Sequence, residues 1–182
     1  DDVDGKSATS ESMTFEITAP DVIIVAADRE QRASANVNIP VNVSGGFDEL
    51  EVNVTGLPSG VTYDPDAGAI SGSAAAGTYG VTITAGNGWN SASRSITLKV
   101  NPDLVASYGN HTLVQGAPVS ILPSVRGLLG TPTWEQLVAS APLPVGLTLD
   151  PDSGAISGTP TVAGSNDDIL VRATDGYDGQ IA

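Results

Sequence analysis

Residues 57–72 read LPSGVTYDPDAGAISG, and residues 143–158 read LPVGLTLDPDSGAISG. Twelve of the sixteen positions are identical, at an offset of 86 residues. The Asp-Pro-Asp at the centre of each copy is followed by Ala-Gly or Ser-Gly, which is a turn sequence. In such a turn Pro presets φ, Asp caps its own backbone and Gly supplies a positive φ. Ile70 and Ile156 then return to the core, so each copy predicts a β-hairpin and not an active site.

The repeat extends beyond the hairpin in both directions. Residues 20–22 parallel 102–104, and residues 83–89 parallel 171–177. The offset drifts from 82 to 88, because a few residues are inserted, mostly around 129–142. A period of about 82 residues is too long for a solenoid repeat and is typical of whole domains in a row.

Apolar and polar residues alternate with a period of two within each unit, as at 37–43, 50–54, 81–85 and 96–100. Such alternation is typical of strands with one face on a core and the other in water, and no convincing helix pattern occurs. The sequence therefore predicts an all-β chain of tandem immunoglobulin-like antiparallel β-sandwiches. We expect them at about 20–101 and 102–182, preceded by a strand at about 9–18.

The inward faces of these strands predict the core. Aromatic residues make up only 4% of the chain, so the core is expected to be mostly aliphatic. Trp134 is expected on an early strand of the second unit, like the buried tryptophan of immunoglobulin folds. The residues expected to be buried are Ile39, Val52, Ile70, Val81 and Ile83 in the first unit, and Ile121, Ile156, Ile169 and Val171 in the second.

The pattern LPxGLxxDxxxGxIxGTPxxxGxY is met twice, over about residues 20–182. It resembles the immunoglobulin-like and dystroglycan-type cadherin-like domains of bacterial surface proteins, which implies a spacer, a stalk or an adhesive tip. The first unit departs from it with Ser73-Ala74 in place of Thr-Pro. The second has Asp167 near where the corner tyrosine, Tyr79, would fall, so we expect it to close that corner differently. The matching residues are Leu57, Pro58, Gly60, Asp64, Gly68, Ile70, Gly72, Gly77 and Tyr79, then Leu143, Pro144, Gly146, Leu147, Asp150, Gly154, Ile156, Gly158, Thr159, Pro160 and Gly164.

Charge and composition exclude several classes of function. The chain has 21 Asp and Glu against 7 Lys and Arg, with a formal net charge of −14. Nucleic-acid binding and attraction to anionic membranes both need clustered basic residues, which are absent. The lack of cysteine excludes disulfides and thiolate chemistry. No apolar stretch approaches the roughly 18 residues of a membrane helix.

Catalytic residues are not predicted anywhere in the chain. His111 is the only histidine, in an expected surface loop, and no GxSxG nucleophile motif accompanies it. Trp89 and Tyr177 follow a glycine at matching loop tips. They could contact a ligand, but we favour a role in covering the end of the sandwich. The chain is therefore predicted not to be an enzyme, with no catalytic, cofactor-binding or metal residue.

Calcium is the one ion that the sequence suggests. Asn101 and Asp103 lie between the two units, and Asp175 and Asp178 lie in a loop that resembles a degenerate ligand loop. Each cluster offers only two or three acidic oxygens, whereas calcium takes six to eight ligands, and no DxDxDG loop is present. We predict no cofactor, with calcium at these loops as the alternative to solvated turn carboxylates.

The second unit is expected to stop short of its last strand. In the first unit, residues 91–100 place Ile96, Leu98 and Val100 on one side, whereas in the second the chain leads only to Ala182. Residues 9–18 carry the same pattern at offset 83, with Met13, Phe15 and Ile17. Either residues 1–19 are the tail of a preceding domain in a longer array, or strand 9–18 fills the open edge of the second unit of the next subunit. The latter contact would build a filament.

The favoured function is a non-enzymatic spacer, stalk or adhesin in an extracellular surface protein. A virion component, such as a phage tail, fibre or decoration domain, or a donor-strand-linked filament subunit is the main alternative. A carbohydrate-binding accessory module is a third. Expected partners are other immunoglobulin-like domains of the same or neighbouring chains and a surface receptor or glycan, with no nucleic acid and no membrane insertion. The expected location is extracellular, at a cell surface or on a virion.

Overall fold

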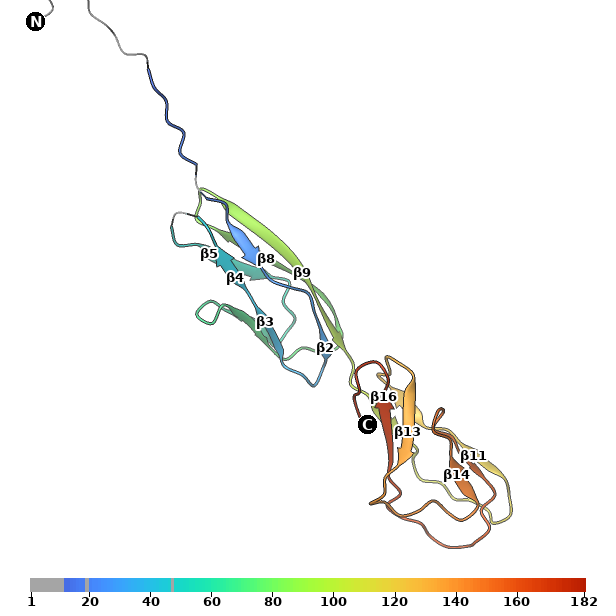
Figure 1. Cartoon of the computed structure of the whole chain (residues 1–182). Helices are drawn as coiled ribbons and strands as arrows, with labels where there is room; N and C mark the ends of the chain where they lie inside the picture. The colour runs from blue at the N-terminus through green and yellow to red at the C-terminus, as the bar shows by residue number, and fades with distance from the viewer. Residues whose placement is uncertain (1–11, 19, 47) are drawn as a thin grey trace, which may run out of the picture.

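The structure, a computed structural model, describes residues 12–18, 20–46 and 48–182. It consists of two β-domains arranged end to end, domain 1 (residues 20–101) and domain 2 (residues 102–182) (Figure 1). In the described residues all regular elements are strands. They are β1 (Ile23–Val25), β2 (Arg29–Arg32), β3 (Val37–Pro40), β4 (Asn42–Ser44), β5 (Glu51–Thr55), β6 (Val61–Asp64), β7 (Ala69–Gly72), β8 (Gly77–Gly86), β9 (Ser91–Asn101), β10 (Val105–Ser107), β11 (Val119–Ile121), β12 (Ser124–Arg126), β13 (Pro132–Gln136), β14 (Leu147–Leu149), β15 (Ile156–Gly158) and β16 (Val171–Asp175).

Domain 1 is a sandwich of two layers. One layer is the four-stranded sheet β2-β9-β8-β5, and the other contains the sheet β3-β7-β6 with the pair β1-β4. β9 is the longest strand, and it lies between β8, to which it is antiparallel, and β2, to which it is parallel. This parallel pair is the one departure from the antiparallel pairing that we expected, and it arises because β2 joins the layer opposite β1.

The repeated turn sequence forms the predicted hairpin in both domains. In β6-β7, the Asp64 carboxylate accepts hydrogen bonds from the backbone N–H of Asp66 and Ala67, at 2.9 and 3.1 Å. In β14-β15, Asp150 does the same for Asp152 and Ser153, at 2.9 and 2.8 Å. Each turn closes on a glycine with positive φ, which is the role that the sequence assigned to the Gly of the motif.

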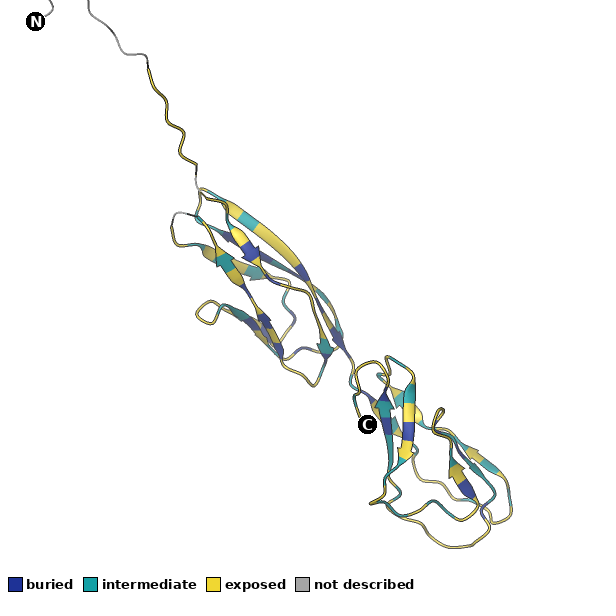
Figure 2. Ribbon diagram, viewed as in Figure 1, coloured by how far each residue is buried: buried dark blue, intermediate teal, exposed yellow. Residues whose placement is uncertain are grey.

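These strands build an aliphatic core in domain 1 and a smaller core around Trp134 in domain 2 (Figure 2). The prediction for domain 1 is confirmed for Ile39, Ile70, Val81 and Ile83, which are at most 2% exposed. Val52 is less buried than predicted: it is half-buried and packs against the edge of the core. In domain 2 the fully buried apolar residues are fewer: Leu104, Trp134, Leu147, Ile156 and Ala173.

Domain 2 repeats the layers of domain 1 with less pairing. Its sheets are β11-β15-β14, β13-β16 and β10-β12. Trp134 is buried on β13 as predicted, and its ring meets that of Tyr108 edge-on at 6.1 Å. Of the predicted core, Ile156 is buried, whereas Ile121, Ile169 and Val171 are only half-buried. Among the described residues, the outer edge of β16 is paired only with residues 180–182.

The corner of domain 1 is closed by Tyr79, as its resemblance to a corner tyrosine implied. The Tyr79 hydroxyl donates to the backbone carbonyl of Ala75, four residues upstream, at 3.0 Å. Domain 2 has no tyrosine there, and Asp167 instead accepts a hydrogen bond from Ser165 within a loop. The strand expected at 9–18 makes no pairing in residues 12–18, and residues 9–11 lie outside the described residues.

Candidate functional site: the joint between the domains

β2 and β9 carry the chain of domain 1 to its border with domain 2. They run in parallel and in register, so that the last residue of β2, Arg32, pairs with the last residue of β9, Asn101. Pro102 and Asp103 follow directly and lead into domain 2. The parallel pairing therefore places the Arg32 side chain at the border, although Arg32 is far from domain 2 in the sequence.

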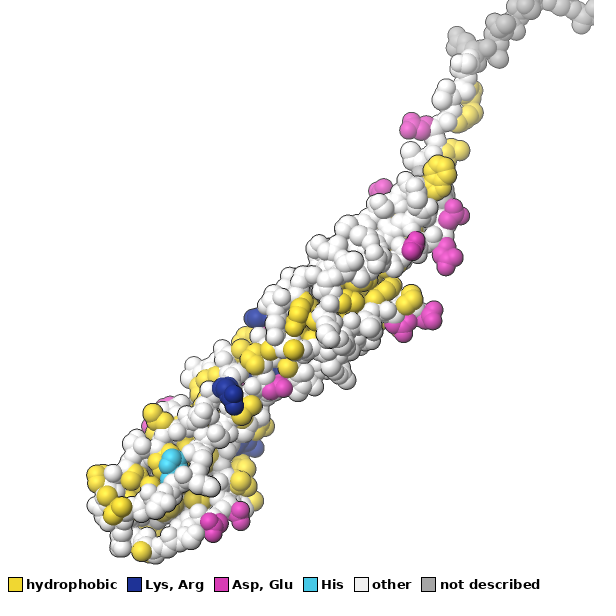
Figure 3. All heavy atoms as spheres, turned by 180° about the vertical axis from the view of Figure 1, so that it is seen from behind, with side chains coloured by type: hydrophobic (Ala, Val, Ile, Leu, Met, Phe, Trp, Pro, Cys, Tyr) yellow, Lys and Arg dark blue, Asp and Glu magenta, His cyan; other side chains and the backbone are white. Residues whose placement is uncertain are grey.

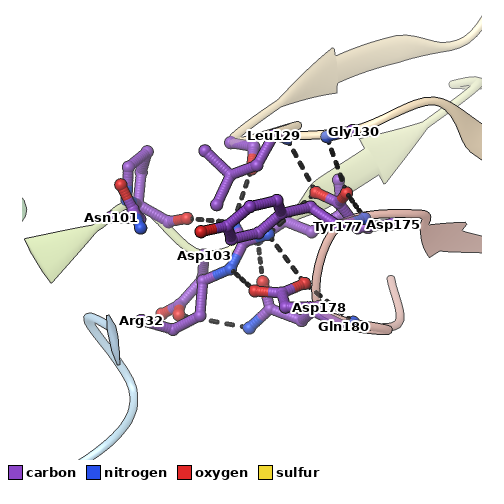
Figure 4. Close-up of polar contacts among 12 residues, drawn as sticks. Arg32, Asn101, Asp103, Leu129, Gly130, Asp175, Tyr177, Asp178 and Gln180 are labelled. Carbon is purple, nitrogen blue, oxygen red and sulfur yellow. Dashed lines mark hydrogen bonds and ion pairs between the residues drawn. The ribbon is translucent and has the colours of Figure 1, made fainter. Parts of the chain in front are cut away.

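The Arg32 guanidinium is buried at this joint and binds domain 2 with all three of its nitrogens (Figure 4). Nε and Nη2 donate to the two carboxylate oxygens of Asp178, at 2.5 and 3.0 Å, and Nη2 also donates to Asp175 at 2.8 Å. Nη1 donates to the backbone carbonyls of Pro102 and Gly127, at 2.6 and 2.5 Å. A planar guanidinium suits this arrangement because its five donors point outward in a fixed fork.

Asp175 is the fully buried acceptor of this cluster, at 0% exposure. Burial alone would raise the pKa of its carboxyl, but the N–H groups of Tyr177, Leu129 and Gly130, together with Arg32, lower that pKa to about 2. The hydrogen bonds from these three N–H groups measure 2.7–2.9 Å. Asp175 thus holds the loops of domain 2 in place and presents an ionised carboxylate to domain 1 at neutral pH.

A second set of contacts surrounds the ion pair. Asp103 accepts hydrogen bonds from the hydroxyl and the N–H of Ser34, at 2.8 and 3.1 Å, which lower the pKa of its carboxyl. The Gln180 side chain accepts from the N–H of Leu104 at 2.5 Å and donates to Asp103 at 3.2 Å. Hydrogen bonds from both domains therefore hold the linker residues Asp103 and Leu104 in place.

Gly127 allows the closest backbone approach at the joint. Its φ is +74°, and a Cβ at this position would lie 2.1 Å from the carbonyl oxygen of Asp103. Only glycine fits such a contact without displacing the backbone. The carbonyl oxygen of Gly127 itself accepts a hydrogen bond from Arg32.

Glu30 and Lys99 form an exposed ion pair on the surface of β2 and β9, with Nζ 2.9 Å from Oε1. Hydrogen bonds from Lys99 and then Asn101 lower the pKa of Glu30. Asn101 is buried and uses its amide to bind Glu30 at 2.8 Å, so it belongs to domain 1 and does not join the acidic cluster.

Three of the four residues that the sequence suggested for calcium, Asp103, Asp175 and Asp178, meet at the joint, but they meet around an arginine. Asp175 and Asp178 bind Arg32, and Asp103 lies beside it. In the part of the chain that the structure describes, no group of three or more His, Asp or Glu residues is placed to hold a metal ion. No sequence motif marks Arg32 as part of this site. The sequence does carry one signal for it: the repeat breaks at this position, because the counterpart of Arg32 at offset 82 is Val114.

The other candidate residues lie apart from the joint or at its rim. His111 is exposed, and its Nε2 lies 2.6 Å from the carbonyl oxygen of Tyr108. Trp89, at the tip of the β8-β9 loop, is 89% exposed, so the expectation that it covers the sandwich end is wrong. Tyr177 is 59% exposed at the joint and is likewise not core. Within the described residues we find no helix with the length and apolar character needed to cross a bilayer.

Two tandem sandwiches of this kind define an immunoglobulin-like protein built from domains in a row. The family described as "Putative Ig domain" matches the chain twice, at residues 17–101 and 102–181, and the chain belongs to this family. No curated protein matches the chain.

Two solved structures have a similar fold, and both are fragments of longer proteins. "Drosophila OTK, extracellular domains 3-5" is 12% identical with a TM-score of 0.53, covering 88% of this chain and 59% of that one. The "I-band fragment I67-I69 from titin" is 10% identical with a TM-score of 0.52, covering 92% and 64%. The chain thus spans less than two thirds of either structure, and at these identities the likeness concerns the fold alone.

Proposed function

We propose that this chain is a stiff, non-catalytic two-domain spacer in an extracellular surface protein. The observation that supports it best is the Arg32 cluster, in which one side chain of domain 1 is bound by two carboxylates and two carbonyls at the border of domain 2. Tandem immunoglobulin-like domains are typical of extracellular and adhesive proteins. Their partners in this role are other immunoglobulin-like domains in the same or neighbouring chains.

Bending the joint would break the hydrogen bonds that Arg32 makes to Asp175, Asp178 and two backbone carbonyls. Domains in one chain move relative to each other by default, unless the interface between them resists. Here the two side chains of the central ion pair, Arg32 and Asp175, are 8% and 0% exposed. Opening the joint exchanges the hydrogen bonds of Arg32 for bonds to water, and hydrogen bonds to charged groups contribute roughly 1.5–3 kcal/mol each to a folded state, which disfavours a bent state.

An adhesive tip that binds glycan is the weaker candidate. Sugar-binding surfaces need several aromatic rings in one place. The exposed Trp89 lies at one end of domain 1, whereas the exposed Tyr177 belongs to domain 2 and lies at the joint, at the other end of domain 1. Trp89 is in the loop after Gly86, whereas Tyr177 is beside the far end of β9. A virion component would use the same stiffness, and a surrounding capsid, tail or fibre would identify it.

The stiffness can be measured as the distribution of distances between two spin labels. The chain has no cysteine, so labels can be attached at Asn53→Cys on domain 1 and Ser120→Cys on domain 2, both exposed. We expect a narrow distribution that becomes broad in Arg32→Ala. Arg94→Ala, on the exposed face of β9, is the matched control and should stay narrow. A distribution that is equally narrow in Arg32→Ala would contradict the proposal.

A further inference from the structure

The distal end of domain 1, which is the end remote from domain 2, repeats the backbone arrangement of the joint (Figure 1). In the joint, the carbonyl oxygen of Asp103 lies so close to Gly127 that a Cβ on this glycine would collide with it. At the distal end, the carbonyl oxygen of Asp21 lies against Gly45 in the same way, and Gly45 has a positive φ of +90°. Both pairs are related by the offset of 82 residues, so each domain builds the same backbone arrangement at the end where its chain enters.

The loop after β8 supplies Asn87 and Asn90, which together with the Pro20 carbonyl form what we call the distal socket. At offset 88, Asn87 corresponds to Asp175, and Asn90 corresponds to Asp178. The Asn87 Oδ1 accepts the backbone N–H groups two and three residues further on, at 3.2 and 3.3 Å. Asp175 likewise accepts the N–H two residues further on, at 2.9 Å. The distal socket therefore has the layout of the joint, with two carboxamides where the joint has two carboxylates.

Each carboxamide of the distal socket has one buried atom without a partner. The orientation of Asn87 is set because its Oδ1 faces backbone donors, and that of Asn90 because its Nδ2 donates to the Pro20 carbonyl at 2.9 Å. The remaining atoms, Asn87 Nδ2 and Asn90 Oδ1, are buried and have no hydrogen-bond partner in the part of the chain that the structure describes. An unpaired buried donor or acceptor is costly. Because both residues are only half-buried, these atoms lie just below the surface, where a neighbouring molecule could satisfy them.

An arginine fits the joint but does not fit the distal socket. In the joint, Arg32 donates to the Pro102 carbonyl, and two carboxylates balance its charge. At the distal end, the Pro20 carbonyl already accepts from Asn90 Nδ2 and from one backbone N–H, at 2.9 and 3.2 Å, which uses both of its lone pairs. A guanidinium also has no acceptor for Asn87 Nδ2. The matching group is a neutral side chain that both donates and accepts, such as an amide or a hydroxyl.

Acidic side chains gather at the distal end. Figure 3 shows Asp and Glu side chains at this end of domain 1 on the face that it displays. Asp21, Asp48 and Glu49, in the segments that contact or follow Gly45, are all exposed. Complementary charges orient two surfaces that meet, so basic side chains around a neutral centre are favoured in a partner.

We propose that the distal socket of domain 1 binds another immunoglobulin-like domain, which presents a neutral hydrogen-bonding side chain where domain 1 itself presents Arg32. This inference rests on the proposed role as a link in a row of domains. The contact follows the existing joint, in which the end of β2 meets the loop after β16. Domain 2 of a second copy is not this partner, because its residue at the position of Arg32 is Val114, whose side chain neither donates nor accepts. The exchange of two carboxylates for two carboxamides therefore selects a different neighbour at each socket.

A tandem protein places a chosen side chain against the distal socket. An added copy of residues 20–101 is fused directly ahead of residues 20–182, so that position 32 of the added copy faces the distal socket as Arg32 faces the joint. Spin labels at Asn53→Cys in both copies of domain 1 report the distance between them, because this residue is exposed and the chain has no cysteine. We expect a broad distribution with Arg32 in the added copy and a narrow one with Arg32→Gln. Arg32→Met, which is similar in length but has no donor, is the control and should stay broad.

Exchange of the socket should reverse this preference. Asn87→Asp/Asn90→Asp in the second copy gives the distal socket the two carboxylates of the joint. In that protein we expect Arg32 of the added copy to give the narrow distribution and Arg32→Gln the broad one. Equal widths for Arg32 and Arg32→Gln against the unchanged socket would overturn the proposal.

Acrylamide quenching of Trp89 is an independent readout of contact at the distal end. Trp89 lies between the two asparagines of the distal socket and is 89% exposed, whereas the other tryptophan, Trp134, is 4% exposed. The added copy carries Trp89→Phe, so the quenching reports Trp89 of the second copy. Quenching should be weaker in the Arg32→Gln tandem than in the Arg32→Met tandem, with the same far-UV circular dichroism, and equal quenching would contradict the proposal. The joint between domains 1 and 2 is unchanged in all these proteins, so failure here is distinguishable from failure of the spacer function.

Discussion

Arg32 of domain 1 and Asp175 of domain 2 form a buried ion pair, with Nη2 2.8 Å from Oδ2. Asp175 also accepts three backbone N–H groups of its own domain, so the pair connects the border of domain 1 to loops of domain 2. Asp178 adds a second carboxylate to the same guanidinium but is 28% exposed. This difference in burial separates the roles of the two aspartates.

Asp175→Asn should destabilise the protein far more than Asp178→Asn. The first change leaves Arg32 with one carboxylate and directs an amide N–H₂ toward backbone donors, which costs about 3–5 kcal/mol by analogy with other broken buried pairs. The second removes a partly exposed partner, and such pairs contribute about 1 kcal/mol or less. Urea unfolding followed by the fluorescence of the buried Trp134 measures both values. Equal losses would mean that Asp175 has no special place in the joint.

The repeated hairpins and most of the core-facing residues of domain 1 could be predicted from the sequence, because they depend on local signals. Turn residues at fixed positions and a period of two specify which residues pair and which face the core. The Asp64 and Asp150 turns are direct examples, since each carboxylate binds N–H groups two and three residues away.

The joint could be predicted only in part. The sequence places Asp103 between the domains and Asp175 and Asp178 in a separate candidate ligand loop, but their counter-charge, Arg32, comes from β2, at least 71 residues away. Its position depends on the parallel pairing of β2 with β9, which leaves no local pattern. The exposure of Trp89 could not be predicted from a local pattern either. It depends on the length of the β8-β9 hairpin, whose tip lies away from the core.

The joint should withstand moderate acid and open only at very low pH. The pKa of Asp175 is lowered from an ordinary value of 3.8 to about 2 in the folded protein. A depressed carboxyl pKa stabilises the folded state fully above the ordinary value, and the effect is lost as pH falls toward the folded value. Arg32 contributes part of the shift of Asp175 and is the largest cause of the lowered pKa of Asp178, and this contribution of Arg32 is what links the joint to pH.

The spin-label distances between the domains should therefore stay narrow at pH 5 and broaden between about pH 4 and 2. The Arg32→Ala protein serves as the control, because its distribution should be broad throughout this range. Broadening that is complete above pH 5 would show that groups other than these aspartates hold the joint.

Removal of calcium should not change the melting temperature. The oxygens of Asp175 are already bound by N–H groups and Arg32, and two carboxylates fall well short of the six to eight ligands that calcium takes. For the same reason, added calcium should not restore a narrow distance distribution to Arg32→Ala. Thermal melts with a chelator, and then with excess calcium, measure this. A lowered midpoint that calcium reverses would instead identify a bound ion at the joint.

Gly154 and Gly68 occupy the same position of the repeated turn, yet only Gly154 should be intolerant of alanine. Their φ values are +71° and +59°, so each substitution costs about 1–2 kcal/mol for the left-handed backbone. A Cβ on Gly154 would lie 2.6 Å from the ring of Trp134, whereas the nearest atom to one on Gly68 is the carbonyl oxygen of Val41 at 3.3 Å.

The clash adds about 1–3 kcal/mol of overpacking at Gly154, because Trp134 is only 4% exposed and has little room to move. We therefore expect Gly154→Ala to destabilise domain 2 by clearly more than Gly68→Ala destabilises domain 1. Hydrogen exchange of the amides in β6-β7 and β14-β15 reports each domain separately within one protein. Equal losses in the two hairpins would show that Trp134 yields to the added methyl group, and that the backbone conformation alone accounts for the glycine in this motif.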